Sequence, residues 1–358
     1  MIAHRALPAV YWISDANPPL GVAAGELGDP APPGLPSGSM TLLAEARAIL
    51  PDMVALRRRI HRRPELGLRT PETQRLVVEA LDRLGLEPRL GERLTSVTAV
   101  IGQDRPGRTV VLRAEMDALP LTEETGLEFA SALPGAMHAC GHDTHVAMLL
   151  GAARLLGERL RRDPEALPGP VLLMFQPGEE GFAGARIMLE EGLLHDLNPP
   201  ITRGFALHIS TLYPAGQVHI RPGALLASAD NFFITVHGRG GHASTPHAAA
   251  DPIPTAAEIV LALQVAVSRE VDIFDPVVLT VGHVAAGTTH NVIPETAFLE
   301  GTFRCVSEAG RAAMPELIRR VADRVAAAYG LAAEVRFEEI YPATINDPEA
   351  TAQVTAMA

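Results

Sequence analysis

Between residues 97 and 207 the sequence alternates short apolar runs with longer helical segments, and this alternation constrains the fold more than any other feature. The expected strands are 97–101, 109–112, 171–175 and 204–207, and the expected helices between them are about 144–160 and 183–194. An earlier helix is expected to begin after Thr70 as N-cap and to end at Gly85. Strands that alternate with helices usually form a largely parallel sheet covered on both faces. We therefore predict an α/β fold with a mostly parallel sheet flanked by helices.

The order of elements changes after Pro222. We expect a strand at 231–236, a helix at 254–267, strands at 277–284 and 297–304, a helix at 307–329 and a strand at 333–338. This is the split βαβ order of a small α+β sandwich. The sequence therefore predicts an α+β domain at 221–338, inserted into an α/β domain that comprises 40–220 and 339–358.

Residues 1–39 differ from the rest of the chain. They are rich in Pro, Gly and Ala and have no periodicity, a composition typical of disordered segments. A strongly helical stretch begins at Met40. We expect either a disordered leader or a start codon assigned too far upstream.

The composition excludes several classes of protein. A net charge of −12 argues against a nucleic-acid surface, and no apolar run reaches membrane-spanning length. Two cysteines, Cys140 and Cys305, cannot form a disulfide framework. We expect a globular cytoplasmic protein that binds neither nucleic acid nor membrane.

Polar clusters follow three of the predicted strands. Residues 113–120 and then 138–145 follow the predicted strand at 109–112. Residues 176–181 follow the strand at 171–175, and His208 follows the strand at 204–207. In open α/β sheets, ligands gather beyond the carboxyl ends of the strands. Thiolate, imidazole and carboxylate groups together suit zinc, manganese, cobalt or nickel. A lone cysteine, a glutamate pair or a histidine usually has a structural explanation, but three clusters at three strand ends favour a metal site.

The residue types divide the work at this site. Gly141 permits a tight turn, so Cys140 and His142 can face one ion. Adjacent carboxylates can act as ligand and free base, and we assign Glu180 as ligand and Glu179 as base. We expect the remaining acidic residues, Asp117 and Asp143, to orient ligands, and Asp143 could also cap the following helix.

At these residues the chain resembles the aminoacylase/carboxypeptidase-type dinuclear metallohydrolases. Within them it is similar to the branch of hippurate hydrolases, indole-acetyl-amino-acid hydrolases and N-acetyldiaminopimelate deacetylases. The resemblance runs from about Val54 to Tyr341 and is carried by 60–66, 137–145, 175–181, 240–243 with 246–247, and 291–294. It implies hydrolysis of the amide bond of a small N-acyl amino acid.

The resemblance also assigns roles to residues. It implies that two divalent metal ions are bound by Cys140, His142, Glu180 and His208, with Glu179 as general acid/base. It implies a homodimer formed through the inserted domain. His242 matches a histidine that stabilises the oxyanion in the partner's site, and Asn291 matches a substrate-contacting asparagine.

Two departures and three alternatives accompany this interpretation. Glu115 stands where the family motif usually has Asp, and family members continue past Ala358 with a segment that brings a final His ligand. A catalytically impaired homologue that retains partial metal or substrate binding is therefore one alternative, and a dipeptidase of the same family is another. A cysteine hydrolase with Cys140 as nucleophile and His142 as base is less favoured, because it leaves both glutamates unused.

Overall fold

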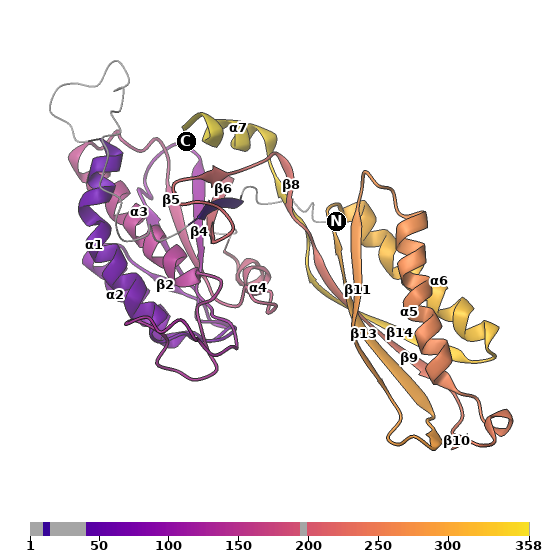
Figure 1. Cartoon of the computed structure of the whole chain (residues 1–358). Coiled ribbons are helices and arrows are strands. Elements are labelled where there is room, and N and C mark those ends of the chain that lie inside the picture. The colour runs from indigo at the N-terminus through magenta and orange to yellow at the C-terminus, as the bar shows by residue number, and fades with distance from the viewer. Residues whose placement is uncertain (1–9, 15–40, 194–198, 358) are drawn as a thin grey trace. The chain divides into compact units, whose positions relative to one another are not determined.

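The computed structural model describes residues 10–14, 41–193 and 199–357, and the chain divides into two compact units (Figure 1). One unit runs up to Ile220 and resumes at Glu349, and the other comprises Arg221–Pro348. Each unit has its own hydrophobic core. Within the described ranges, no helix combines the length and the apolar character that crossing a membrane requires.

The first unit is built on a seven-stranded mixed sheet in the order β2-β3-β5-β4-β6-β1-β7. Its strands are β1 (Val10–Ser14), β2 (Arg89–Leu90), β3 (Val97–Ile101), β4 (Thr109–Glu115), β5 (Val171–Gln176), β6 (Ile201–Ser210) and β7 (Val218–His219). The pairs β5/β4, β4/β6 and β6/β1 are parallel, whereas β2/β3, β3/β5 and β1/β7 are antiparallel.

The sheet is therefore mixed and not mostly parallel as expected, with three parallel pairs at its centre and three antiparallel pairs toward its edges. The short connection at 102–108 between β3 and β4 reverses the chain. A connection of that length cannot form the crossover that parallel strands need. Strand β3 consequently runs antiparallel to β5, while the long connections around β5 and β6 give parallel neighbours.

Strand β1 corrects a second expectation. Val10–Ser14 pair with β6 and β7, so these residues belong to the sheet and not to a disordered leader. The run contains Val, Tyr, Trp and Ile, which favour strands, but the surrounding Pro-rich composition outweighed this signal. The rest of the predicted leader, residues 1–9 and 15–39, lies outside the described residues.

Helices cover both faces of this sheet. Helices α1 (Leu42–His61), α2 (Pro71–Arg83) and α3 (His142–Arg162) share one core with the sheet, and α4 (Gly184–Glu190) lies over the other face. Helix α7 (Pro348–Met357) follows the second unit. Strand β5 contributes Val171, Leu173 and Phe175 to the first core and Leu172 and Met174 to the second. Because successive side chains alternate between faces, every residue of this apolar strand is buried.

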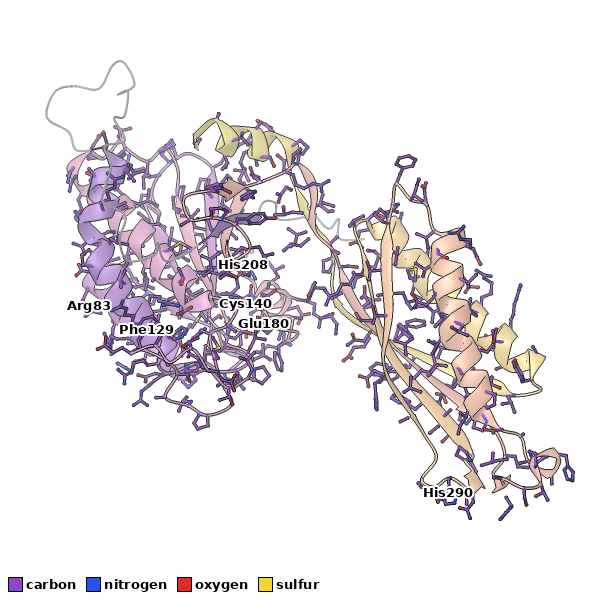
Figure 2. All side chains as sticks on the ribbon, viewed as in Figure 1. Arg83, Phe129, Cys140, Glu180, His208 and His290 are labelled. Atoms are coloured by element: carbon purple, nitrogen blue, oxygen red, sulfur yellow. The ribbon has the colours of Figure 1, made fainter. Side chains whose placement is uncertain are left out.

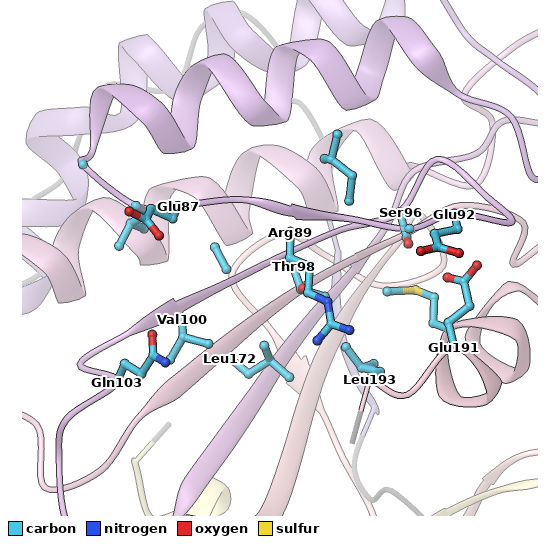
Figure 3. Close-up of a pocket in the computed structure, with 16 residues that line it drawn as sticks. Glu87, Arg89, Glu92, Ser96, Thr98, Val100, Gln103, Leu172, Glu191 and Leu193 are labelled. Carbon is cyan, nitrogen blue, oxygen red and sulfur yellow. The ribbon is translucent and has the colours of Figure 1, made fainter. Parts of the chain in front are cut away.

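A cavity of 640 Å³ lies in the first unit (Figure 3). Leu172 and Val100 of the sheet line it, and Arg89 and Glu191 stand at its walls. None of its lining residues belongs to the predicted polar clusters at the strand ends. The cavity is therefore separate from the candidate site.

The second unit contains a four-stranded antiparallel sheet in the order β11-β13-β9-β14, with two helices packed on it. The elements follow the predicted split βαβ order: β9 (Ala229–His237), α5 (Pro252–Glu270), β11 (Val277–Ala286), β13 (Thr296–Cys305), α6 (Glu308–Ala328) and β14 (Ala332–Tyr341). Alternate residues of β9, namely Phe232, Ile234 and Val236, are fully buried in its core.

Short strands extend the second unit at both ends. It continues past residue 338 to Pro348, because β15 (Thr344–Asn346) pairs with β8 (Gly223–Leu226). Elsewhere in the unit, β10 (Gly241–His242) pairs with β12 (Val292–Ile293), and the 3₁₀ helix η1 (Pro246–Ala248) follows β10.

Candidate metal centre

The candidate site lies in the first unit, where β4, β5 and β6 end. Asp117 follows β4, Glu179 and Glu180 follow β5, and His208 lies near the end of β6. Cys140 and His142 stand at the start of α3; Figure 2 labels Cys140, Glu180 and His208. The three strands are parallel, so their carboxyl ends meet at one edge. The fold thus brings together residues that are far apart in the sequence.

The side chains of these residues converge closely. Sγ of Cys140 lies 3.3 Å from Nε2 of His208, and Nε2 of His142 lies 3.9 Å from Oε2 of Glu179. Among the predicted site residues, two groups have all their ligand atoms within 4.8 Å of one another: Cys140 with His142 and His208, and His142 with Glu179 and Glu180. His142 belongs to both groups, so the two sets of ligand atoms share one space.

Two buried atoms in this space have no hydrogen-bond partner within the described part of the chain: Nε2 of His142 and Oε1 of Glu180. The Nδ1 atom of His142 donates to the carbonyl oxygen of Asp117 at 2.8 Å, so Nε2 is the nitrogen that can bind an ion when it carries no proton. Leaving buried polar atoms unpaired is costly. A thiolate, imidazoles and carboxylates form the donor set of zinc and similar divalent ions, so the residues fit a metal site.

The electrostatics of the site also favour a cation. Burial lowers the pKa of His208 to about 4, which keeps the ring in the neutral form that metals bind. Burial also lowers the pKa of His142, but Asp117 and Cys140 outweigh it and hold this pKa well above its ordinary value. The acidic groups that raise this pKa would also attract a metal ion.

Glu179 has a pKa that is shifted toward neutrality. Burial raises the pKa of Glu179 to about 7, against an opposing effect of His142. Its side chain is about one-third exposed (34%), so it can reach a water molecule or a substrate. A carboxylate with this pKa can take up and release a proton near neutral pH.

Asp117 connects several of these residues. Its fully buried carboxylate accepts hydrogen bonds from the backbone N–H groups of Glu179 and Glu180, each at 3.0 Å. Its carbonyl oxygen accepts the hydrogen bond from His142. One residue therefore fixes the backbone of both glutamates and the ring of a candidate ligand.

Asp143 does not occupy the position expected for it. The Oδ2 atom of Asp143 accepts a hydrogen bond from Nδ1 of His61 at 2.7 Å and lies 2.6 Å from Nε of Arg57. The N-cap of α3 is Gly141, without a side-chain cap. In the described ranges Asp143 contacts no ligand imidazole. His61 and Arg57, in the last turns of α1, hold its Oδ2 atom through a long-range contact that local sequence patterns do not reveal.

Gly141 is required by its surroundings. It has φ +82°, in the left-handed region, and a Cβ atom there would lie 2.3 Å from Cδ1 of Ile209. Only glycine combines this conformation with so close a neighbour. The tight turn between Cys140 and His142 that the sequence predicts therefore depends on this residue.

His242 and Asn291 lie together in the second unit. Strands β10 and β12 pair, and the N–H of Ala243 donates to the carbonyl oxygen of Asn291 at 3.1 Å. The N–H of Ser244 donates to Nδ1 of His242 at 3.2 Å. A neutral His242 ring then carries its proton on Nε2, and because the residue is exposed, this N–H is available to a ligand.

His145 and Glu115 form a contact that the sequence patterns did not predict. Nδ1 of His145 lies 2.7 Å from Oε2 of Glu115, and both residues are buried. The spacing of three between His142 and His145 places them on the same side of a helix, and this was a usable signal. The partner on β4 could not be found in this way.

Comparison with known proteins identifies the family of the chain. The family model described as peptidase family M20/M25/M40 matches residues 111–358. Thermostable carboxypeptidase 1 of Saccharolobus solfataricus is 41% identical over 87% of this chain and 78% of its own length. N-acetylcysteine deacetylase of Bacillus subtilis is 40% identical over 82% of this chain and 76% of its own length.

A solved structure supports the same relationship. The YXEP protein of Bacillus subtilis, described as a dinuclear metal-binding peptidase of the M20 family, superposes with a TM-score of 0.73. It is 35% identical, and the match covers 86% of this chain and 81% of that one. Together with the donor set at the strand ends, these similarities show that the chain belongs to peptidase family M20/M25/M40 and is a metallohydrolase.

Proposed function

We propose that the protein hydrolyses the amide bond of small N-acyl amino acids, using two divalent metal ions held by Cys140, His142, Glu180 and His208. The observation that carries the proposal is the pair of buried, unpaired atoms, Nε2 of His142 and Oε1 of Glu180, beside a thiol and a second imidazole. The substrate class is supported by the deacetylase relative, whose name specifies an N-acetylated amino acid.

In the proposed hydrolysis, Glu179 would transfer protons, Asp117 would position Glu179, and water would be activated by the metal ions. Bound metal ions would polarise the amide carbonyl and make a water molecule more acidic. Glu179 accepts a proton from the attacking water as the new C–O bond forms, and it returns this proton to the leaving nitrogen as the C–N bond breaks. Asp117 holds the backbone at Glu179 in place and so positions its carboxylate.

The test is hydrolysis by the metal-free protein and by protein reloaded with manganese, zinc, cobalt or nickel. The substrates would be hippurate, N-acetyl amino acids and N-acetyldiaminopimelate. We expect release of the amino acid only from metal-loaded protein. Metal binding without turnover would favour an impaired homologue, and absence of both would refute the proposal. Dipeptides belong in the same panel, because the carboxypeptidase relative favours a dipeptidase as the second candidate.

We further propose that the inserted unit, predicted at 221–338, forms a homodimer in which His242 donates its Nε2–H to the oxyanion in the partner's site and Asn291 contacts substrate. Helix α5 supports an interface. Its inner face is buried through Ile259 and Leu263, but Ile253, Leu261 and Val265 are 44%, 62% and 59% exposed. A helix that is apolar on both faces normally has a second partner.

Charge placed on α5 is therefore expected to separate the dimer. We predict that wild-type protein sediments as a dimer and that Leu261→Glu shifts it to monomer, because the glutamate would have to be desolvated in the interface. Leu212→Glu is the matched control, since Leu212 is 81% exposed and lies in the first unit. A monomeric wild type, or a Leu261→Glu variant that remains dimeric, would contradict the model.

We also infer a cytoplasmic location. Both cysteines are free, and Cys140 would have to stay reduced to bind metal. Fractionation of cells that express the protein tests this inference, and recovery outside the cytoplasm would refute it.

A further inference from the structure

A buried network beside the candidate metal site connects Glu115 with His208. Glu115 ends β4 and His145 lies in the first turn of α3, and their exposed fractions are 3% and 2%. The network continues through the backbone of Ile209 in β6. Neither Glu115 nor His145 has a role in the mechanism proposed above, so a buried carboxylate and a buried imidazole are left to be explained.

The backbone determines which ring nitrogen of His145 carries the proton. The N–H of Ile209 donates to Nε2 of His145 at 3.0 Å, so this nitrogen is the acceptor. The proton of a neutral imidazole is then on Nδ1, which donates to Oε2 of Glu115 at 2.7 Å. His145 has no lone pair left for a metal, although its nitrogen lies within 4.8 Å of ligand atoms of Glu115 and His142. We therefore exclude His145 as a ligand.

Ile209 carries the effect of His145 to His208. The carbonyl oxygen of Ile209 accepts a hydrogen bond from Nδ1 of His208 at 2.7 Å. The rings of His145 and His208 meet edge to face, with their centroids 4.7 Å apart. On its other side, the Nε2 atom of His208 faces Sγ of Cys140. The orientation of the His208 ring thus depends on the backbone of Ile209, whose N–H His145 holds in place.

Glu115 is anchored in turn by its other oxygen. Arg113 forms an ion pair with Oε1 of Glu115, and Nε of Arg113 donates to Oε1 of Gln176 at 2.7 Å. The N–H of Met116 donates to the carbonyl oxygen of Gln176 at 2.8 Å. Glu115 is therefore held in place at the ends of β4 and β5. His145 of α3 lies between this carboxylate and the backbone of Ile209 in β6.

We propose that Glu115 and His145 are positioning residues that orient His208 for metal binding through the backbone of Ile209. This inference rests on the proposed function, because it takes His208 as a ligand. Outer partners of ligand histidines fix the ring orientation, and their loss typically lowers metal affinity about 10- to 100-fold. Here the ring of His208 is held through the backbone N–H and carbonyl groups of Ile209, and not through a direct contact between carboxylate and ligand.

The test is titration of the metal-free, full-length protein with Co²⁺ alone. Competition with a chelator gives the dissociation constant, and visible absorption reports the geometry around the thiolate and imidazole ligands. We expect Glu115→Gln and His145→Asn to bind Co²⁺ about 10- to 100-fold more weakly and to change the spectrum. The control is His237→Gln, which removes an exposed histidine 3.6 Å from Glu334 in the second unit and should change neither.

A second background separates positioning from general loss of structure. In a His208→Ala protein, Glu115→Gln should cause no further loss of affinity, because the path ends at His208. Equal losses in both backgrounds, or unchanged affinity and spectrum in the single variants, would overturn the proposal. If the single variants do not fold, His145→Gln provides another test. Its amide oxygen can accept the hydrogen bond from the N–H of Ile209, so this variant should bind Co²⁺ as the wild type does. Weaker binding would overturn the proposal. A wild type that binds no Co²⁺ would refute the proposed function itself.

Discussion

Replacing Glu179 with Gln is expected to lower kcat by about 10²- to 10⁴-fold, the usual contribution of a general base. The amide keeps the size of the side chain and the backbone hydrogen bond to Asp117, but it cannot accept the proton. Metal content should remain that of the wild type, because Glu180 and not Glu179 is the proposed ligand. The measurements are steady-state kinetics on the substrate that the panel identifies and metal analysis of the same sample.

The matched control for this variant is Glu316→Gln, an exposed residue of α6 in the second unit. It should leave kcat and metal content unchanged. A Glu179→Gln enzyme with kcat within a few-fold of the wild type would exclude Glu179 as the base. Loss of metal together with activity would instead make Glu179 a ligand and would reverse the roles assigned to the two glutamates.

Replacing His142 with Ala is expected to have the second large effect, which is on metal binding. His142 belongs to both groups of candidate ligands, so its removal weakens the site for both ions. The loss of affinity should exceed about 100-fold, since outer partners of ligands alone contribute 10- to 100-fold. Metal analysis after dialysis and calorimetric titration measure it.

Thermal unfolding gives an independent measure of the same effect. Metal at 100 times its dissociation constant stabilises a folded protein by about 2.7 kcal/mol, so a chelator should lower the melting temperature of the wild type but not that of His142→Ala. His237→Ala, in the second unit, is the control and should respond as the wild type does. Full metal content in His142→Ala would remove this residue from the ligand set.

The edge of the sheet that carries the candidate site could be predicted because it depends on local patterns. Each cluster directly follows an apolar strand, and parallel neighbours bring the ends of such strands together. Gly141, Cys140 and His142 were linked by a turn that only glycine permits. These features lie within a few residues of one another, so the sequence contains the necessary information.

Features that depend on distant partners could not be predicted. The direction of Asp143 is set by His61 and Arg57 from another helix, and the role of His145 depends on Glu115 and on the backbone of Ile209. The antiparallel β3 and the strand β1 likewise follow from pairings between remote segments. Hydrophobic pattern and strand propensity indicate which secondary structure a segment prefers, but they do not indicate which distant residues it will contact.

The convergence of candidate ligands from the ends of β5 and β6 and the start of α3 has a consequence for the lifetime of the protein. An ion shared by these segments would act as a cross-link, because none of them could open without releasing it. Backbone amides in these strands should exchange with solvent more slowly when metal is present, and proteases should cut there less often. At a given rate of synthesis, the amount of folded protein in a cell would then rise with the supply of metal.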